Sequence, residues 1–588
     1  MTVDATQDAR PDALGSWPAL SLAQAHALMT QPGAVFEIEE LDIRGVKTRV
    51  WKNGPKTFVD LFAAGRAWGE RIFMVYEGER VSYDAFARAA LVFARELQEA
   101  GLKKGDRVAI AMRNMPEWPV AFFAASLAGA VVTPLNAWWT GQELEYGLID
   151  SGARIAILDA ERLHRLAERL PECPALECVY VARDDEELSR PRLKKLEDII
   201  GRPDAWAQLP DTPLPDVAID PEDNATILYT SGTTGAPKGA LGTHRNAMSN
   251  VLTAAISQAR SFVRRGEAPP APDPNAPQKV GLLAIPFFHV TGLCAVLGPT
   301  IFGGSRIVMM RRWEPEAAFA MIEKERVTLT GGVPTIAWQL LEHPARLKYD
   351  LSSLDTVSYG GAPAAAELVR RLKEAFPKSQ PGTGWGMTET SGSFTHHYAE
   401  DYQHRPESCG PASPVCEMKV VGSNGETVPP GEVGELWGKG PGIVVGYWNK
   451  PQASAETFVD GWVKTGDLAR IDEEGFCYIV DRAKDMIIRG GENIYSAEVE
   501  AVLYEHPDVL DAGLVPIPHQ TLGEEPGAVV TLKAGSTASE DDLRAHVADR
   551  LAAFKVPVRV ILSRDMLPRN ANGKILKGEL KKLFVPAP

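Results

Sequence analysis

Tyr229-Thr-Ser-Gly-Thr-Thr-Gly-Ala-Pro-Lys-Gly239 is the stretch of this 588-residue chain that most directly indicates its fold and chemistry. It combines four serine and threonine hydroxyls, three glycines and one lysine within eleven residues. Glycine allows backbone N–H groups to turn toward an anion, hydroxyl groups donate to phosphate oxygens, and lysine adds positive charge. The stretch therefore predicts a loop that binds phosphate groups.

The loop follows a strand-like run, Ala225–Tyr229, which argues against the plain alternative of a flexible Ser/Thr/Gly surface loop. A Walker phosphate loop requires the pattern G-x-x-x-x-G-K-[ST]. Here Pro237 precedes Lys238 and Gly239 follows it. We expect a phosphate-binding loop of a different kind.

The chain before this loop alternates between helix-like and strand-like segments. Apolar residues recur at helical spacing between Ser82 and Gly101 and again across Glu117–Leu127. Short apolar runs typical of buried strands are Val108–Met112, Ala130–Pro134, Ile155–Leu158 and Val179–Val181. Strands separated by helices imply parallel sheets with helices on both faces, so we predict an α/β fold with stacked sheets.

The pattern changes after about residue 484, where a compact α+β unit of about 100 residues follows. We predict a helix from Ser496 to before Pro507, strands at Val509–Val515 and Ala528–Leu532, and a helix capped by Ser539 with Leu543, Val547 and Leu551 on one face. The predicted domains are a large N-terminal domain, residues 1–483, and a small C-terminal domain, residues 484–588.

Composition and charge narrow the class of protein. The 62 lysine and arginine residues against 77 aspartate and glutamate residues give a net charge of −15, which disfavours nucleic acid and anionic membranes as partners. The longest strongly apolar stretch, Val120–Val132, is shorter than the roughly 20 residues that span a bilayer, so we expect a buried helix and no integral membrane segment. Residues 1–10 show no signal-peptide pattern, and the six cysteines form no C-x-x-C pair. We expect a cytoplasmic protein, and leave a homodimer open.

Six further motifs follow in order along the chain. They are Pro286–Gly292 with His289, Tyr359–Pro363, Gly384–Glu389, Lys464–Asp467, Asp481–Asp485 and Pro568–Lys574. Trp385, Thr388 and Glu389 together offer an aromatic plate, a hydroxyl and a carboxylate, which suit a base, a phosphate and Mg²⁺. Asp467 and Arg482 suit a ribose diol. Each motif alone has a structural explanation, such as a turn or a core histidine, but their joint order indicates one nucleotide site.

This ordered set resembles the adenylate-forming superfamily of acyl-CoA synthetases, luciferases and peptide-synthetase adenylation domains, with a pattern most similar to fatty-acid or aryl acid CoA ligases. The resemblance covers about residues 55–580. It implies an enzyme that uses ATP, Mg²⁺ and coenzyme A, and a mobile C-terminal domain with its hinge at Lys484.

The resemblance also implies roles for individual residues. ATP would be held by Thr230, Ser231, Gly232, Thr233, Thr234, Gly235, Lys238, Gly361, Ala362, Pro363, Trp385, Gly386, Met387, Asp467, Arg482 and Asn493. The implied catalytic residues are Lys574, Glu389, Thr388 and His289, with Glu389 as the Mg²⁺ ligand. CoA would approach Gly490 and Gly491, and the acid pocket would be lined by His289, Gly332, Val333, Gly360 and Met387.

The implied reaction has two halves. The substrate carboxylate attacks the α-phosphorus of ATP and pyrophosphate leaves; a thiolate then attacks the mixed anhydride and AMP leaves. Both reactants of the first half are anions, so positioning and charge neutralisation matter more than proton transfer. A swing about Lys484 would present Lys574 for the first half and Gly490–Gly491 for the second.

The pocket segments suggest a substrate class. Phe287–Thr291 lacks the aspartate with which peptide-synthetase domains bind an amino acid, and no carrier domain follows Lys574. We therefore expect a small-molecule carboxylic acid and free CoA. The small and apolar residues of Gly331–Trp338 favour a medium- or long-chain fatty acid. An aromatic or arylalkanoic acid, and an acyl-AMP ligase that does not use CoA, are the alternatives.

Two other classes are less well supported. Lys574 argues against a non-catalytic nucleotide-binding relative, and no G-x-S-x-G or H-E-x-x-H motif supports a hydrolase. His396, His397 and His404 lack well-placed partners for zinc, so we expect them on a loop near the pocket mouth.

Overall fold

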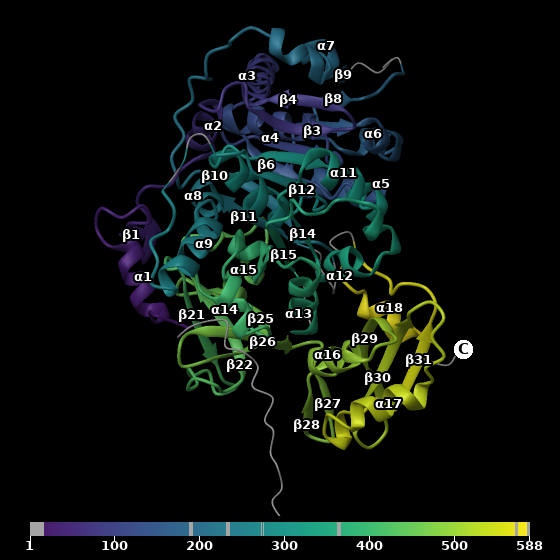
Figure 1. The fold of residues 1–588 in the computed structure, drawn as a ribbon. Helices are drawn as coiled ribbons and strands as arrows, with labels where there is room; N and C mark the ends of the chain where they lie inside the picture. The colour runs from purple at the N-terminus through teal and green to yellow at the C-terminus, as the bar shows by residue number, and fades with distance from the viewer. Residues whose placement is uncertain are drawn as a thin grey trace, which may run out of the picture.

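The computed structural model describes residues 17–186, 192–230, 236–271, 273, 276–361, 366–570 and 574–584. Of the predicted ATP site, residues 231–235 together with Ala362 and Pro363 lie outside the described residues. Three large sheets and a smaller C-terminal sheet organise the chain (Figure 1).

The first sheet has eight strands in the order β23-β11-β10-β6-β5-β7-β8-β9. Their bounds are β5 Arg107–Ala111, β6 Val131–Pro134, β7 Ile155–Asp159, β8 Cys178–Ala182, β9 Leu193–Lys195, β10 Asn224–Tyr229, β11 Gly239–Thr243 and β23 Gly446–Tyr447. The strands from β10 to β9 pair in parallel, and β11 and β23 are antiparallel additions at one edge. The four predicted short strands are β5 to β8, so this prediction is confirmed.

The second sheet also has eight strands, in the order β19-β16-β15-β14-β12-β13-β3-β4. They are β3 Ile72–Tyr76, β4 Glu79–Ser82, β12 Val280–Leu283, β13 Arg306–Met309, β14 Leu329–Gly332, β15 Thr356–Gly360, β16 Gln380–Gly384 and β19 His397–Tyr398. The six central strands are parallel, and β4 and β19 close the two edges in antiparallel fashion. This is the predicted stacked α/β architecture.

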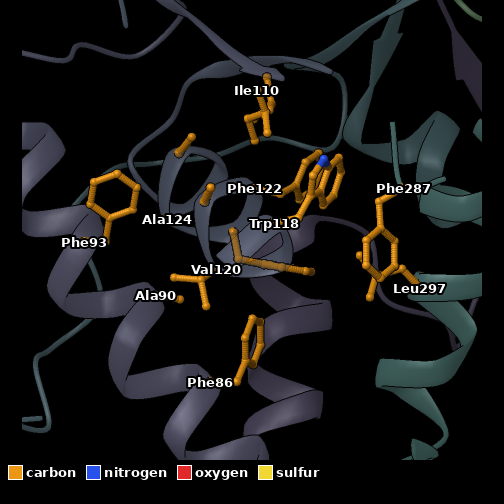
Figure 2. Close-up of a cluster of buried hydrophobic side chains, with 14 of the residues drawn as sticks. Phe86, Ala90, Phe93, Ile110, Trp118, Val120, Phe122, Ala124, Phe287 and Leu297 are labelled. Atoms are coloured by element: carbon orange, nitrogen blue, oxygen red, sulfur yellow. The ribbon is translucent and has the colours of Figure 1, made fainter. Parts of the chain in front are cut away.

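Helices α3 (Tyr83–Glu99) and α4 (Glu117–Leu127) form the centre of the main hydrophobic core. Ser82 caps α3 by accepting the Ala85 N–H, and every residue of α4 is buried. Figure 2 shows side chains of α3 and α4 in one buried cluster with Phe287 and Leu297, and the Trp118 ring lies 5.1 Å from that of Phe287. Fully burying one such aromatic side chain contributes about 1.5–3 kcal/mol, so this core fixes the two sheets relative to each other.

The other helices cover the sheets or connect their strands. They are α1 Leu22–Thr30, α2 Phe58–Arg66, α5 Gly141–Ser151, α6 Ala160–Leu166, α7 Glu197–Ile200, α8 His244–Met248, α9 Thr253–Arg264, the π-helix η3 Thr291–Leu297, α10 Gly298–Phe302, α11 Pro315–Glu325, α12 Pro334–Glu342, α13 Ala366–Ala375, α14 Ala399–His404 and α15 Pro451–Thr457. In the described part of the chain, none of the helices combines the length and apolar character needed to cross a bilayer.

A third, antiparallel sheet has the order β20-β26-β25-β22-β21. Its strands are β20 Gly410–Pro411, β21 Glu417–Val421, β22 Gly434–Lys439, β25 Trp462–Ile471 and β26 Phe476–Arg482, and β24 (Phe458–Val459) pairs with β25. The smaller sheets are the hairpin β1 Ile38–Ile43 with β2 Val46–Trp51 and the pair β17 Gly386–Met387 with β18 Gly392–Ser393.

The C-terminal part forms a separate lobe, drawn in yellow-green in Figure 1. It holds strands β27 Ile487–Arg489, β28 Glu492–Ile494, β29 Val509–His519, β30 Gly523–Leu532 and β31 Arg559–Ser563, and helices α16 Ser496–Glu505, α17 Glu540–Ala548 and α18 Lys577–Lys582. Its buried side chains, among them Leu503, Leu514 and Leu543, form a cluster of their own. The predicted α+β fold of this part is confirmed.

Two boundaries differ from the predictions. The apolar stretch Val120–Val132 is not one helix, because α4 ends at Leu127 and Gly129, with φ +84°, turns the chain into β6. Leu551 lies beyond α17, which ends at Ala548, yet its side chain still packs against the C-terminal core. In both cases apolar periodicity continues past the point at which the backbone turns.

Candidate active site

A cavity of about 1470 Å³ opens at the carboxyl ends of the parallel strands of both large sheets. This is the edge at which open α/β sheets bind ligands. The wall takes Thr230 from the first sheet, Gly360 from the second and Thr465 from the third. The C-terminal lobe contributes Asn570 and Lys574, so four parts of the fold meet at one site.

Most of the predicted site residues that the structure describes line this cavity. They are Thr230, Lys238, His289, Gly332, Val333, Gly360, Gly361, Trp385, Gly386, Met387, Thr388, Glu389, Arg482, Lys484 and Lys574. Asp467 lies just behind the wall, and Gly490, Gly491 and Asn493 are exposed outside it.

Glu389 is held in a short 3-10 turn, Thr388–Thr390, at the bottom of the nucleotide side. The Tyr447 hydroxyl donates to Glu389 Oε1 at 2.6 Å, and burial raises the pKa of the Glu389 carboxyl. The Lys238 ammonium stands 4.9 Å from the Tyr447 ring centroid. A lysine from the connection between β10 and β11 and a carboxylate from the turn after β17 are thus joined through Tyr447.

These residues fit a magnesium ion held together with phosphates. Mg²⁺ prefers oxygen ligands and is often bound by one or two carboxylates plus substrate phosphate oxygens. Glu389 supplies one carboxylate, and Thr230 and Thr388 add hydroxyls in the same wall. In the described ranges no cluster of three or more Asp, Glu, His or Cys side chains could hold a metal without such added ligands.

The predicted ribose contacts are paired with each other. Asp467 and Arg482 face each other across β25 and β26, with Arg482 Nε 3.3 Å from Asp467 Oδ1. The Trp385 Nε1–H donates to Asp467 Oδ2 at 2.8 Å. Trp385 therefore has a fixed orientation at the cavity wall, while Asp467 is buried beneath it, with 6% of the residue exposed.

Lys574 reaches the cavity from a short hairpin of the C-terminal lobe. Its N–H donates to Asn570 Oδ1 at 3.0 Å, and the Asn570 N–H donates back to its carbonyl at 2.9 Å. Burial, followed by the charges of Arg482 and Lys484, lowers the pKa of Lys574 to about 8. The Lys574 side chain is therefore a cation at neutral pH and loses its charge as the pH rises through about 8.

Glycine residues line part of the acid side of the cavity. A Cβ on Gly331 would lie 1.6 Å from the Ser358 carbonyl oxygen, so no side chain fits there. His289 accepts the Thr291 N–H at Nδ1 (3.3 Å), and burial lowers its pKa to about 4. His289 is therefore a neutral ring at the start of the π-helix η3.

Three sequence predictions about side chains near the acid pocket were wrong. Trp338 does not line the cavity, because its ring packs 5.4 Å from the Arg371 guanidinium on the other side of α12. His397 is fully buried, with Nδ1 at 3.1 Å from the Ser408 carbonyl, and His404 stacks on Trp17. Only His396 of the three histidines reaches the cavity among the described residues.

Several cavity residues carried no sequence prediction. Arg113 follows β5 and lies 4.5 Å over the Trp138 ring, and Arg311 follows β13. The rule that ligands bind at carboxyl ends of parallel strands could have found these arginines. Tyr447 could not have been found, because it reaches the site through pairing of β23 with β11, about 200 residues earlier in the chain.

Comparison with known proteins agrees with this geometry. The family model of AMP-binding enzymes matches residues 61–448, and that of the AMP-binding enzyme C-terminal domain matches residues 498–574. Feruloyl-CoA synthase of an Amycolatopsis species is 37% identical over 514 residues, which are 86% of this chain and 94% of that protein. The long-chain-fatty-acid–CoA ligase of Bacillus subtilis is 34% identical over 525 residues, 86% of this chain and 90% of its own.

A solved structure of a CoA synthetase also resembles this chain over most of its length. O-succinylbenzoate coenzyme A synthetase (MenE) of Bacillus subtilis, in complex with ATP and a magnesium ion, has a TM-score of 0.71 and 29% identity. The match covers 89% of this chain and 98% of that one.

Fold and site together define an adenylate-forming enzyme. The chain belongs to the family of AMP-binding enzymes, over both its main and its C-terminal parts. It is an AMP-forming acid–thiol ligase, an acyl-CoA synthetase.

Proposed function

We propose that this ligase activates a medium- or long-chain fatty acid as its acyl-adenylate and transfers the acyl group to CoA. The observation that carries this proposal is the length of one part of the cavity, here called the acid arm. The acid arm runs along strands β12 to β16 and is lined on its other side by α9, η3 and α10, through residues such as Ala255, Val296 and Phe302.

The acid arm extends along the full length of the strands of the second sheet. Lining residues stand at the carboxyl ends of its strands, at Gly332 and Gly360, and just before their amino ends, at Thr328 and Asp355. A five-residue strand such as β15 spans about 16 Å. This length suits an extended alkyl chain.

An aromatic acid is the second candidate, because the feruloyl-CoA synthase relative is named for one. A bulky ring would fill the glycine-lined region near Gly331 and leave the rest of the acid arm to solvent. The fatty-acid ligase relative matches at similar identity, so the relatives alone do not choose between the two substrates.

In the first half-reaction, the chain's own cations offset the charge of two anions. Lys238 would hold the pyrophosphate end of ATP, Lys574 would bridge the acid carboxylate and the α-phosphate, and Glu389 would hold Mg²⁺. When bound, Mg²⁺ adds positive charge at the phosphates. Fixed charges in a site that excludes water stabilise a developing negative charge without reorganisation, so attack on the α-phosphorus needs no proton transfer.

The second half-reaction requires a different face of the C-terminal lobe. We propose that residues 1–483 and 484–588 act as two domains with a hinge at Lys484. In the arrangement described here Lys574 is in the cavity, whereas Gly490, Gly491 and Asn493 are exposed on the β27–β28 hairpin. Rotation about the hinge would exchange them and leave side-chain-free backbone beside the pantetheine arm of CoA. A cytoplasmic location and a homodimer stay predictions.

The proposal is tested by incubating the enzyme with ATP, Mg²⁺ and one acid at a time, with and without CoA. Octanoate, hexadecanoate, cinnamate and ferulate form the panel. We expect AMP release that requires both acid and CoA and is fastest with a fatty acid. Release of ADP, or AMP release indifferent to CoA, would contradict the ligase mechanism, and a preference for ferulate would favour the aromatic candidate.

A further inference from the structure

His396 is a half-buried polar side chain in the wall of the acid arm, and the reaction described above gives it no role. It precedes β19 and lies beside Gly384, the last residue of β16, because Thr383 pairs with His397. Its ring Nδ1 is 2.9 Å from the hydroxyl of Ser257 on α9. The ring therefore bridges the sheet and the helix that enclose the substrate, close to the carboxylate end.

The contacts of Ser257 determine which ring nitrogen carries the proton. Arg260 Nη2 donates to the Ser257 hydroxyl at 3.3 Å and to the His396 carbonyl at 2.7 Å. A guanidinium can only donate, so Ser257 Oγ accepts from Arg260. The Ser257 hydroxyl is buried and must itself donate, and among the described residues His396 Nδ1 is the acceptor within its reach, so its proton goes there. Arg260 is itself buried and lies 3.4 Å from Asp401, which fixes the chain of contacts.

His396 is thus a neutral imidazole with its proton on Nε2. Burial, followed by the charge of Arg260, lowers the pKa of His396 to about 4. Within the described residues Nε2 makes no protein hydrogen bond, and His396 lines the cavity. The Nε2–H group is a hydrogen-bond donor offered to whatever fills the cavity.

An entirely apolar chain would displace water from this donor and leave it unpaired. Leaving a buried donor unpaired is costly, and sites built to hydrogen-bond a substrate group discriminate against analogues that lack it. Gln258, adjacent to Ser257 on α9, also lines the cavity and adds a second polar group on this side.

We propose that His396 is a specificity-determining residue that selects acids with an oxygen acceptor near the carboxylate end or on a ring. The inference rests on the proposed function and narrows its substrate class. The acceptor could belong to a hydroxylated or oxo fatty acid or to an oxygenated aromatic acid, since both present the same chemistry to Nε2–H.

The experiment compares kcat/KM for two matched pairs, 3-hydroxydecanoate with decanoate and ferulate with cinnamate. We expect the oxygenated member of one pair to be preferred by about 10- to 100-fold. The pair that shows the preference identifies the source of the oxygen. His396→Phe keeps a ring but removes the donor, so the preference falls to within about threefold of unity, whereas His396→Gln retains a donor and part of the preference.

Ser257→Ala is the second variant, because it frees Nδ1 to take the proton without changing the ring that lines the cavity. It should reduce the same preference, and unchanged melting temperatures would show that all three variants fold. A wild-type enzyme that converts both members of each pair equally, or a preference that survives in His396→Phe, would overturn the inference while leaving the proposed function intact. Failure to activate any of these four acids, together with failure on octanoate and hexadecanoate, would overturn both.

Discussion

At the scale of single residues, Tyr447 illustrates how the site depends on a hydrogen bond. Its hydroxyl holds one oxygen of the buried Glu389 carboxylate, and its ring lies under the Lys238 ammonium. We expect Tyr447→Phe to slow acid-dependent pyrophosphate exchange by about 10-fold and to raise the Mg²⁺ concentration required, because the Glu389 carboxylate loses its orientation. Titrating Mg²⁺ in the exchange assay measures this. An unchanged Mg²⁺ dependence would mean that Tyr447 contributes packing and does not orient the Glu389 carboxylate.

The lowered pKa of Lys574 gives a second prediction at this scale. Because its pKa is about 8, the ammonium is present below that pH and is lost as the pH rises through it. Adenylation that needs this charge should therefore decline above about pH 8. Lys574→Arg keeps a cation at all accessible pH values, so its profile should stay flat there, although its rate is lower. A decline that persists in Lys574→Arg would assign the titration to another group.

A site residue could be predicted from the sequence when its function depends on neighbouring residues in the same short motif. Glu389 and Lys574 stand in compact motifs, in which neighbouring residues in sequence are also neighbours at the site. Tyr447 and the donor role of His396 depend on contacts with residues more than 50 positions away, at Glu389 and at Ser257. No short-range pattern encodes such contacts.

At the scale of secondary structure, elements whose pattern lies within one segment were predicted, and elements that depend on pairing with a distant segment were not. Helix α4 has the ends predicted for Glu117–Leu127, although apolar content alone extended the expected helix to Val132. The third sheet was not predicted, since it includes the two-residue strand β20, paired with Cys477 of β26 more than 60 residues later. Strands this short carry little pattern of their own and form only when a partner strand is in place.

The π-helix η3 is the element that should set the chain length of the acid. Val296 lies on its cavity face, and a larger side chain there would obstruct the acid arm. We expect Val296→Trp to reduce kcat/KM for hexadecanoate by at least about 10-fold while octanoate is affected much less. Val35→Trp, at a position 73% exposed and outside the cavity, is the matched control. An equal loss for both acids would place the acyl chain elsewhere.

At the scale of the whole molecule, a buried network spans the proposed hinge. The Ser496 hydroxyl donates to Asp481 Oδ2 at 2.9 Å, and Lys577 Nζ donates to Ser496 Oγ at 2.7 Å. Lys577 also contacts Glu500 at 2.9 Å. Asp481 precedes Lys484 in the chain, whereas the other three belong to the C-terminal lobe. The network therefore stabilises the arrangement that keeps Lys574 in the cavity.

Asp481→Asn should weaken this arrangement, because an amide replaces the charge that faces Lys577. We expect pyrophosphate exchange to fall about 10-fold, with thioester formation from preformed acyl-adenylate unchanged or faster. Asp549→Asn, at an exposed aspartate of the same lobe outside this network, is the control. Slower thioester formation in Asp481→Asn would argue that the network serves both arrangements.

The central claim, one site served in turn by two faces of the C-terminal lobe, is tested most directly by separating the half-reactions in Lys574→Ala. Acid-dependent pyrophosphate exchange and CoA-dependent consumption of purified acyl-adenylate are measured side by side. The account predicts that exchange falls by about 100-fold or more while consumption of the acyl-adenylate stays within about threefold of the wild type. An equal loss in both half-reactions would contradict it.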